Sequence, residues 1–88
     1  MKLNDEFILR QVADKWVVLA LGNASIDFSG MLTLNESGVM LWQSLEQGAD
    51  REKLVDVLTA EYAVSREVAS QDVDEFLAKL AKAGCLEM

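Results

Sequence analysis

The spacing of the apolar residues changes once along this chain, near Asn35, and this change constrains the fold more than any other feature. Before Asn35, apolar residues alternate with polar ones or form short runs, which is typical of β-strands. After Asn35, apolar residues recur every three or four positions, which is typical of amphipathic helices. The chain has no proline and no stretch rich in serine and glycine that would mark a linker. We therefore predict a single domain over residues 1–88, built from strands followed by helices.

The first part of the chain predicts three strands, near residues 6–12, 15–21 and 27–34. Short connections of turn-forming residues separate them, which favours an antiparallel meander. The second segment is apolar at both odd and even positions, as expected of a central strand that is covered on both faces. The third segment alternates apolar and polar residues around Gly30, and we expect it to lie at an edge of the sheet.

The second part predicts three helices, near residues 36–47, 51–62 and 66–83. Asn35, Asp50 and Ser65 precede these helices and are good N-cap residues. Gly48 and Gly84 follow the first and third helices, where glycine commonly ends a helix. The predicted fold class is therefore α+β, a three-stranded antiparallel meander followed by a three-helix bundle. It is winged-helix-like in its parts but not in their order.

The residue types exclude most catalytic chemistry. The chain has no histidine and one cysteine, Cys85, which excludes Ser-His and Cys-His couples, histidine-ligated metals, an intramolecular disulfide and multi-cysteine clusters. Cys85 follows the end of a predicted helix, where the helix dipole raises a thiol pKa, so we interpret it as a packing residue. The fifteen Asp and Glu residues are interpreted as helix caps and solvated surface. We predict no enzymatic activity, no metal site and no cofactor.

Charge and hydropathy exclude two classes of partner. The net charge is −7, and residues 35–88, with five basic and eleven acidic side chains, carry −6 of it. Helices with that charge repel phosphates, which excludes nucleic-acid binding. The longest apolar run, Trp16 to Leu21, has six residues and is too short to span a membrane, and the N-terminus lacks a signal-peptide pattern. We therefore expect a cytoplasmic protein with no membrane partner.

The third predicted helix carries more apolar residues than one packing face needs. Val73 and Leu77 form a row beside a second row of Ala69, Phe76 and Leu80, and one row is enough to bury the helix. The other row would line a groove beside the free edge of the third strand. An unpaired edge next to an apolar groove is a docking site for an extended peptide, which adds as a further strand. The candidate binding residues are Phe28, Gly30, Met31, Leu32 and Thr33 on the strand, and Val73, Leu77 and Leu80 on the helix.

The sequence leaves two alternatives open. Val73, Leu77 and Leu80 could all pack against the first helix, which would leave no groove. The charge of a bound peptide is also open, because the acidic domain favours basic residues whereas Lys79 and Lys82 favour a carboxylate.

Three segments of the sequence resemble a known family. They are Leu34-Asn35-Glu36-Ser37-Gly38 with Leu41-Trp42, Glu52-Lys53-Leu54-Val55 with Glu61-Tyr62, and Asp72-Val73-Asp74-Glu75-Phe76-Leu77 with Leu80 and Gly84. In combination they are similar to the PqqD family, pyrroloquinoline quinone biosynthesis protein D and its relatives, over Phe7 to Leu86. The resemblance implies a peptide chaperone made of three antiparallel strands and three helices. Such a domain binds the leader of a ribosomally made precursor peptide between its third strand and third helix, and presents it to a modifying enzyme, often a radical SAM enzyme.

One departure from the family pattern bears on the substrate. Phe28-Ser29-Gly30 stands where the quinone-pathway members have a Tyr-Pro-Glu-like step, so we expect a different precursor peptide. The competing interpretation is a non-catalytic structural adaptor or a homodimer. The same third-strand edge that would accept a peptide is able to pair with the edge of a second copy.

Overall fold

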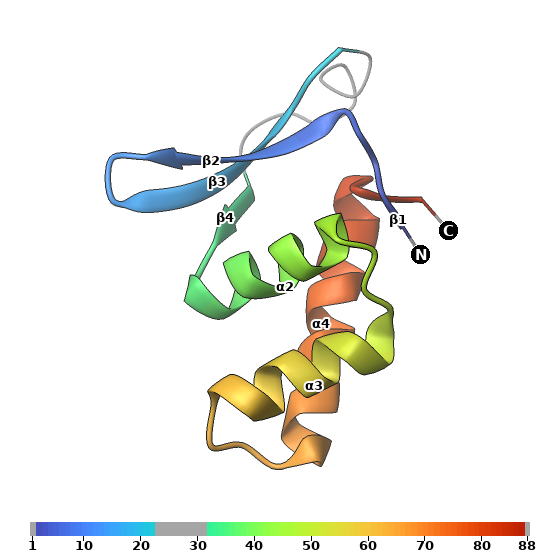
Figure 1. Ribbon diagram of the computed structural model, residues 1–88. Helices are drawn as coiled ribbons and strands as arrows, with labels where there is room; N and C mark the ends of the chain where they lie inside the picture. Colours follow the sequence, from blue (N-terminus) through green and yellow to red (C-terminus); the bar gives the residue numbers. More distant parts are fainter. Residues whose placement is uncertain (1, 23–31, 88) are drawn as a thin grey trace.

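The computed structural model describes residues 2–22 and 32–87 and confirms the α+β fold class. The strands are β1 (Lys2–Leu3), β2 (Phe7–Val12), β3 (Lys15–Ala20), β4 (Leu32–Leu34) and β5 (Leu86–Glu87). The helices are α2 (Glu36–Glu46), α3 (Arg51–Glu61) and α4 (Arg66–Ala83). Figure 1 shows the sheet above α2 and one end of α4, with α3 on the far side of the helices from the sheet. Every predicted boundary within the described residues is met to within one residue, whereas the start predicted for the third strand lies outside them.

Strands β2, β3 and β4 form an antiparallel sheet with β3 in the centre, as predicted. Val18 of β3 lies opposite Leu9 of β2 and Leu32 of β4, so these three side chains share one face. That face packs on the helices, since Phe7, Val18 and Leu34 belong to the same hydrophobic core as residues of α2, α3 and α4. Among the described residues, β4 has β3 as its one neighbouring strand and is therefore an edge strand.

The predicted capping residues begin all three helices. Asn35 Oδ1 accepts a hydrogen bond from the Gly38 N–H at 2.9 Å, and Asp50 Oδ1 accepts one from the Lys53 N–H at the same distance. Ser65 does the same at the start of α4. Each bond satisfies a backbone donor that the first turn of a helix leaves unpaired. These local bonds explain why the helix starts were predictable from residue types alone.

The core extends from the inner face of the sheet into the space between the helices, where α3 packs on α2 and α4. The largest side chains that are fully buried are those of Trp42, Leu54, Leu80, Val18, Val55, Val73 and Cys85. None of the helices in the described ranges is long and apolar enough to cross a membrane.

The two ends of the described chain form a small sheet that the sequence analysis did not predict. Strand β1 pairs with β5, with Leu3 opposite Leu86, and the Asn4 N–H donates to the Cys85 carbonyl at 2.7 Å. Figure 1 shows β1 and β5 side by side at the end of α4. Strands of two residues carry no recognisable period, so only the contact between distant segments reveals them.

Cys85 is a packing residue, as predicted, but burial rather than the helix dipole perturbs its thiol. The side chain is fully buried and belongs to the core. Burial raises the pKa of the thiol to about 11, because an apolar surrounding disfavours the thiolate.

We expect this thiol to make the protein less stable between about pH 9 and pH 11. In the unfolded chain the thiol has its ordinary pKa of 9.0 and loses its proton first, whereas the folded protein keeps it until about 11. The unfolded state then binds fewer protons, so the free energy of unfolding falls as the pH rises, by up to about 3 kcal/mol. Urea denaturation of the wild type and of Cys85→Ala across this range measures the effect. The alanine variant should not show this fall in the free energy of unfolding. If the free energies of unfolding of the two proteins changed in parallel with pH, the prediction would be contradicted.

Candidate functional site

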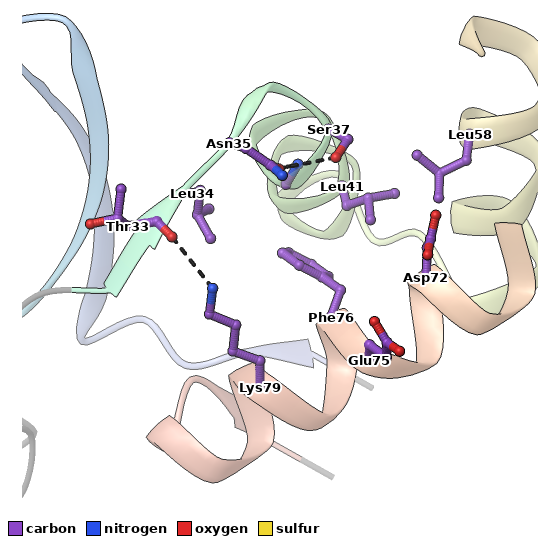
Figure 2. Close-up of a pocket in the computed structure, with 11 residues that line it drawn as sticks. Thr33, Leu34, Asn35, Ser37, Leu41, Leu58, Asp72, Glu75, Phe76 and Lys79 are labelled. Atoms are coloured by element: carbon purple, nitrogen blue, oxygen red, sulfur yellow. Dashed lines mark hydrogen bonds between the residues drawn. The ribbon is translucent and has the colours of Figure 1, made fainter. Parts of the chain in front are cut away.

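A cleft of about 530 Å³ lies between β4, the first turns of α2 and the central part of α4. Figure 2 shows Leu34 from one wall, and Phe76 and Lys79 from the other, pointing toward it. It is lined by Thr33, Leu34, Asn35, Ser37, Gly38, Leu41, Leu58, Asp72, Glu75, Phe76 and Lys79. A second hollow of about 350 Å³ continues the cleft toward the end of α3, and shares Asn35, Ser37, Leu58 and Asp72 with it.

The floor of the cleft is apolar and its rim is polar. Leu34, Leu41 and Phe76 come from β4, α2 and α4 and are nearly buried, with 5%, 3% and 9% of their surface exposed. The rim carries the charged side chains of α4, namely Asp72, Glu75 and Lys79. Such a combination suits a ligand that inserts apolar side chains and keeps polar groups at the surface.

The corner between β4 and α2 depends on the spacing of Asn35 and Gly38. A side-chain carbon at Gly38 would lie 3.2 Å from Asn35 Oδ1 and 3.3 Å from the Leu34 Cβ. Glycine therefore allows α2 to begin close to the edge strand, while its N–H is capped by Asn35. The Asn-x-x-Gly part of the family pattern thus shapes one wall of the cleft.

The backbone of Thr33 faces this cleft rather than the sheet. The Leu21 N–H donates to the Glu6 carbonyl, and bonded pairs alternate along an antiparallel ladder, so Val17 of β3 directs its backbone groups toward β2. Thr33, which lies opposite Val17, therefore directs its N–H and C=O away from β3. An independent contact agrees, because Lys79 Nζ of α4 donates to the Thr33 carbonyl at 3.5 Å (Figure 2).

The predicted site residues within the described ranges differ in their burial and in whether they border the cleft. On β4, Thr33 is exposed at the edge of the cleft and Leu32 is half-buried against the core, whereas Phe28, Gly30 and Met31 lie outside the described residues. Val73 and Leu80 are fully buried in the core and line neither hollow of the cleft.

The cleft does not border the flank of α4 that carries Leu77, which the sequence predicted, but borders the opposite flank. A helix turns about 100° per residue, which puts Asp72, Glu75 and Lys79 on one side of the buried stripe and Leu77 on the other. Leu77 is half-buried there, packs against the core and does not line the cleft. The surplus apolar row is thus accommodated by the core, and a polar row borders the edge strand.

Apart from Lys79, the remaining lining residues were not predicted as binding residues from the sequence. Leu34, Leu41 and Leu58 follow the same helical and strand periods as core residues, so no pattern separates them. Asp72, Glu75, Phe76 and Lys79 do share one helix face, but that pattern is equally typical of a solvated helix. Of the two lysines considered for binding a carboxylate, Lys79 lines the cleft and Lys82 does not.

The charges near the cleft fall into paired and unpaired groups. Arg51 makes a two-pronged contact with Asp74 at 2.7 and 3.0 Å, and these hydrogen bonds lower the pKa of that carboxyl. Arg66 bridges two carboxylates, with one guanidinium nitrogen 2.8 Å from Asp56 and another 2.7 Å from Glu52. Within the described ranges, Asp72 and Glu75 have no basic partner within 4 Å, and no group of three or more His, Cys, Asp or Glu is placed to hold a metal ion.

Comparison with solved structures finds two similar chains. The first, described as TbiB1 in complex with the TbiA(beta) leader peptide, is 32% identical with a TM-score of 0.82, and the match covers 99% of this chain and 95% of that one. The second, described as lasso peptide synthetase B1 complexed with the leader peptide, is 25% identical with a TM-score of 0.77, and the match covers 96% and 93%. No curated protein sequence matches the chain significantly.

The sequence profile of one family matches most of the chain. Residues 15–86 match the family described as coenzyme PQQ synthesis protein D, PqqD. This range begins at β3 and contains every element that builds the cleft. The three strands and three helices agree with the expectation that the resemblance raised. The chain therefore belongs to the PqqD family.

Proposed function

We propose that this chain binds the leader segment of a ribosomally made precursor peptide and presents the peptide to a modifying enzyme. The observation that carries the proposal is the edge of β4, where the Thr33 backbone faces a cleft floored by Leu34 and Phe76. Both similar structures are complexes with a leader peptide, which supports the same role here.

The leader adds to β4 as an antiparallel strand, in this proposal. Its backbone pairs with Thr33, and its alternate side chains enter the cleft toward Leu41 and Phe76. Leu32 and the predicted residues Phe28, Gly30 and Met31 extend the same edge in sequence. Burying two or three apolar side chains stabilises the complex by about 1.5–3 kcal/mol each, less the cost of ordering, which supports micromolar or tighter binding.

The chain acts in this role without catalysis of its own. The sequence has no histidine, and the single thiol is buried with a pKa of about 11, far above the range of an activated nucleophile. The chemistry then belongs to the modifying enzyme, of which a radical SAM enzyme is one class.

A titration tests the proposed function directly. The leader of a short precursor peptide encoded beside this chain, labelled with a fluorophore, is titrated with the purified protein while anisotropy is recorded. We expect saturable binding at micromolar concentration or below, with backbone NMR shifts concentrated at Thr33, Phe76 and Lys79.

Light scattering combined with this titration distinguishes the competing homodimer. A stable dimer in light scattering, with no response to the leader, would favour pairing of β4 with a second copy. A monomer that binds the leader supports the proposal.

Leu77→Lys tests which flank of α4 the peptide uses. Leu77 packs against the core on the flank opposite Asp72 and Lys79. We expect the variant to stay folded, with a free energy of unfolding lowered by about 1–2 kcal/mol, because a half-buried apolar contact is lost. Its affinity for the leader should be unchanged in the anisotropy titration. A folded variant without affinity would place the peptide beside Leu77, where the sequence analysis put it.

A further inference from the structure

Lys79 donates a hydrogen bond to the Thr33 carbonyl, a backbone group with which an added strand would pair. Its ammonium donates to the Thr33 carbonyl at 3.5 Å, and that carbonyl faces the free edge of β4. Glu75 lies one helical turn before Lys79, a spacing that favours an ion pair. Even so, no carboxylate in the described part of the chain lies within 4 Å of the Lys79 ammonium. Lys79 therefore contacts the strand edge and has no competing ion pair there.

The two ends of the cleft carry opposite charges. Lys79 lies at the Thr33 end, where its ammonium reaches the strand. Asp72 lies at the opposite end, where it borders the second hollow together with Asn35 and Ser37 (Figure 2). The basic residues Arg51 and Arg66 on the neighbouring helical surface are paired with other carboxylates. Asp72 therefore sets the negative charge of one end and Lys79 sets the positive charge of the other, while Glu75 lies between them on α4.

The direction in which a peptide strand binds determines the order of charged residues along the peptide that matches the cleft. As β4 continues from Thr33 into α2, the facing residues of α4 run backward from Lys79 to Asp72, so β4 and α4 run in opposite directions along the cleft. A peptide that is antiparallel to β4 runs parallel to α4. Its N-terminal part then faces Asp72, and its C-terminal part faces Lys79.

We infer that the cleft selects leader segments in which a basic residue precedes the apolar residues and an acidic residue follows them. Lys79 acts as a specificity-determining residue. When the peptide binds, a backbone N–H of the peptide replaces the Lys79 ammonium as the donor to the Thr33 carbonyl. The ammonium then pairs with the peptide carboxylate. This inference rests on the proposed function, and it assigns to opposite ends of one cleft the two charge preferences that the sequence left open.

A peptide selection tests the charge order whatever the sequence of the leader. Random peptides about ten residues long, enough for one strand and its flanks, are displayed and selected on the full chain. We expect the enriched peptides to carry Lys or Arg before the apolar residues and Asp or Glu after them. A synthetic peptide from that pool should bind about tenfold more tightly than its charge-swapped permutation, which has the same composition and net charge.

Charge reversal on α4 provides the matched comparison. Lys79→Glu should replace the acidic preference at the C-terminal end by a basic one, and Lys79→Gln should remove it. Lys82→Glu makes the same change at an exposed residue of α4 that does not line the cleft, and should leave the order intact. Circular dichroism checks that each variant is folded.

The outcomes separate the inference from the function on which it rests. Enriched peptides without a charge order, or an order that Lys79→Glu does not alter, would overturn the inference while leaving peptide binding in place. Failure to enrich any peptide on the wild type would contradict the proposed function and the inference with it.

Discussion

Thr33→Pro is expected to leave the domain folded and to weaken leader binding at least tenfold. Proline removes a backbone N–H, and in an edge strand it is tolerated where that N–H points away from the sheet. The Thr33 N–H points toward the cleft, so its pairing partner in the complex would be the peptide and not β3. Losing one backbone bond and placing a ring on the edge costs at least about 1.4 kcal/mol of binding free energy, a factor of about ten.

Gln11→Pro is the matched control for this substitution. Gln11 is exposed on β2, the opposite edge of the sheet. It lies opposite Trp16, whose backbone faces β4, so the Gln11 N–H also points away from the sheet. Thermal unfolding and leader anisotropy measured on both variants compare the two edges. Equal affinity of Thr33→Pro and the wild type would exclude strand addition on β4.

Trp42→Ala is expected to produce the largest loss of stability, about 3–5 kcal/mol, because it empties the centre of the core. Trp42 is fully buried, and within the described part of the structure its indole Nε1 has no hydrogen-bond partner. Trp42→Phe keeps most of the volume and removes an unpaired donor, so its cost should be smaller, about 1–2 kcal/mol. Urea denaturation followed by far-UV circular dichroism measures both.

Trp42→Phe also separates folding from binding within the family pattern. Leu41 lines the cleft, whereas the adjacent Trp42 belongs to the core and does not line it. Trp42→Phe should therefore bind the leader as the wild type does. A folded Trp42→Phe variant with weakened binding would show that the indole contributes to the site.

The starts and ends of the elements could be predicted because their causes are local. Asn35, Asp50 and Ser65 cap helices by bonding to an N–H three residues later, and Gly84 ends α4 in a left-handed conformation with φ of 84°. These interactions span a few residues and require particular residue types at particular positions, so they can be recognised in the sequence. The pairing of β1 with β5 joins distant segments two residues long, and no local pattern marks it.

The sequence alone determined that this chain folds as strands followed by helices, that it has an edge strand, and that a helix with surplus apolar surface follows it. Tertiary structure decided which flank of α4 borders that edge. Val73 and Leu80 satisfy the helical period of a groove as well as that of a core, and burial in three dimensions assigns them to the core. Packing of Leu34 and Phe76 brings β4 toward the flank of Asp72, Glu75 and Lys79. A one-dimensional pattern records how apolar a face is, but the neighbour of that face depends on how distant elements pack.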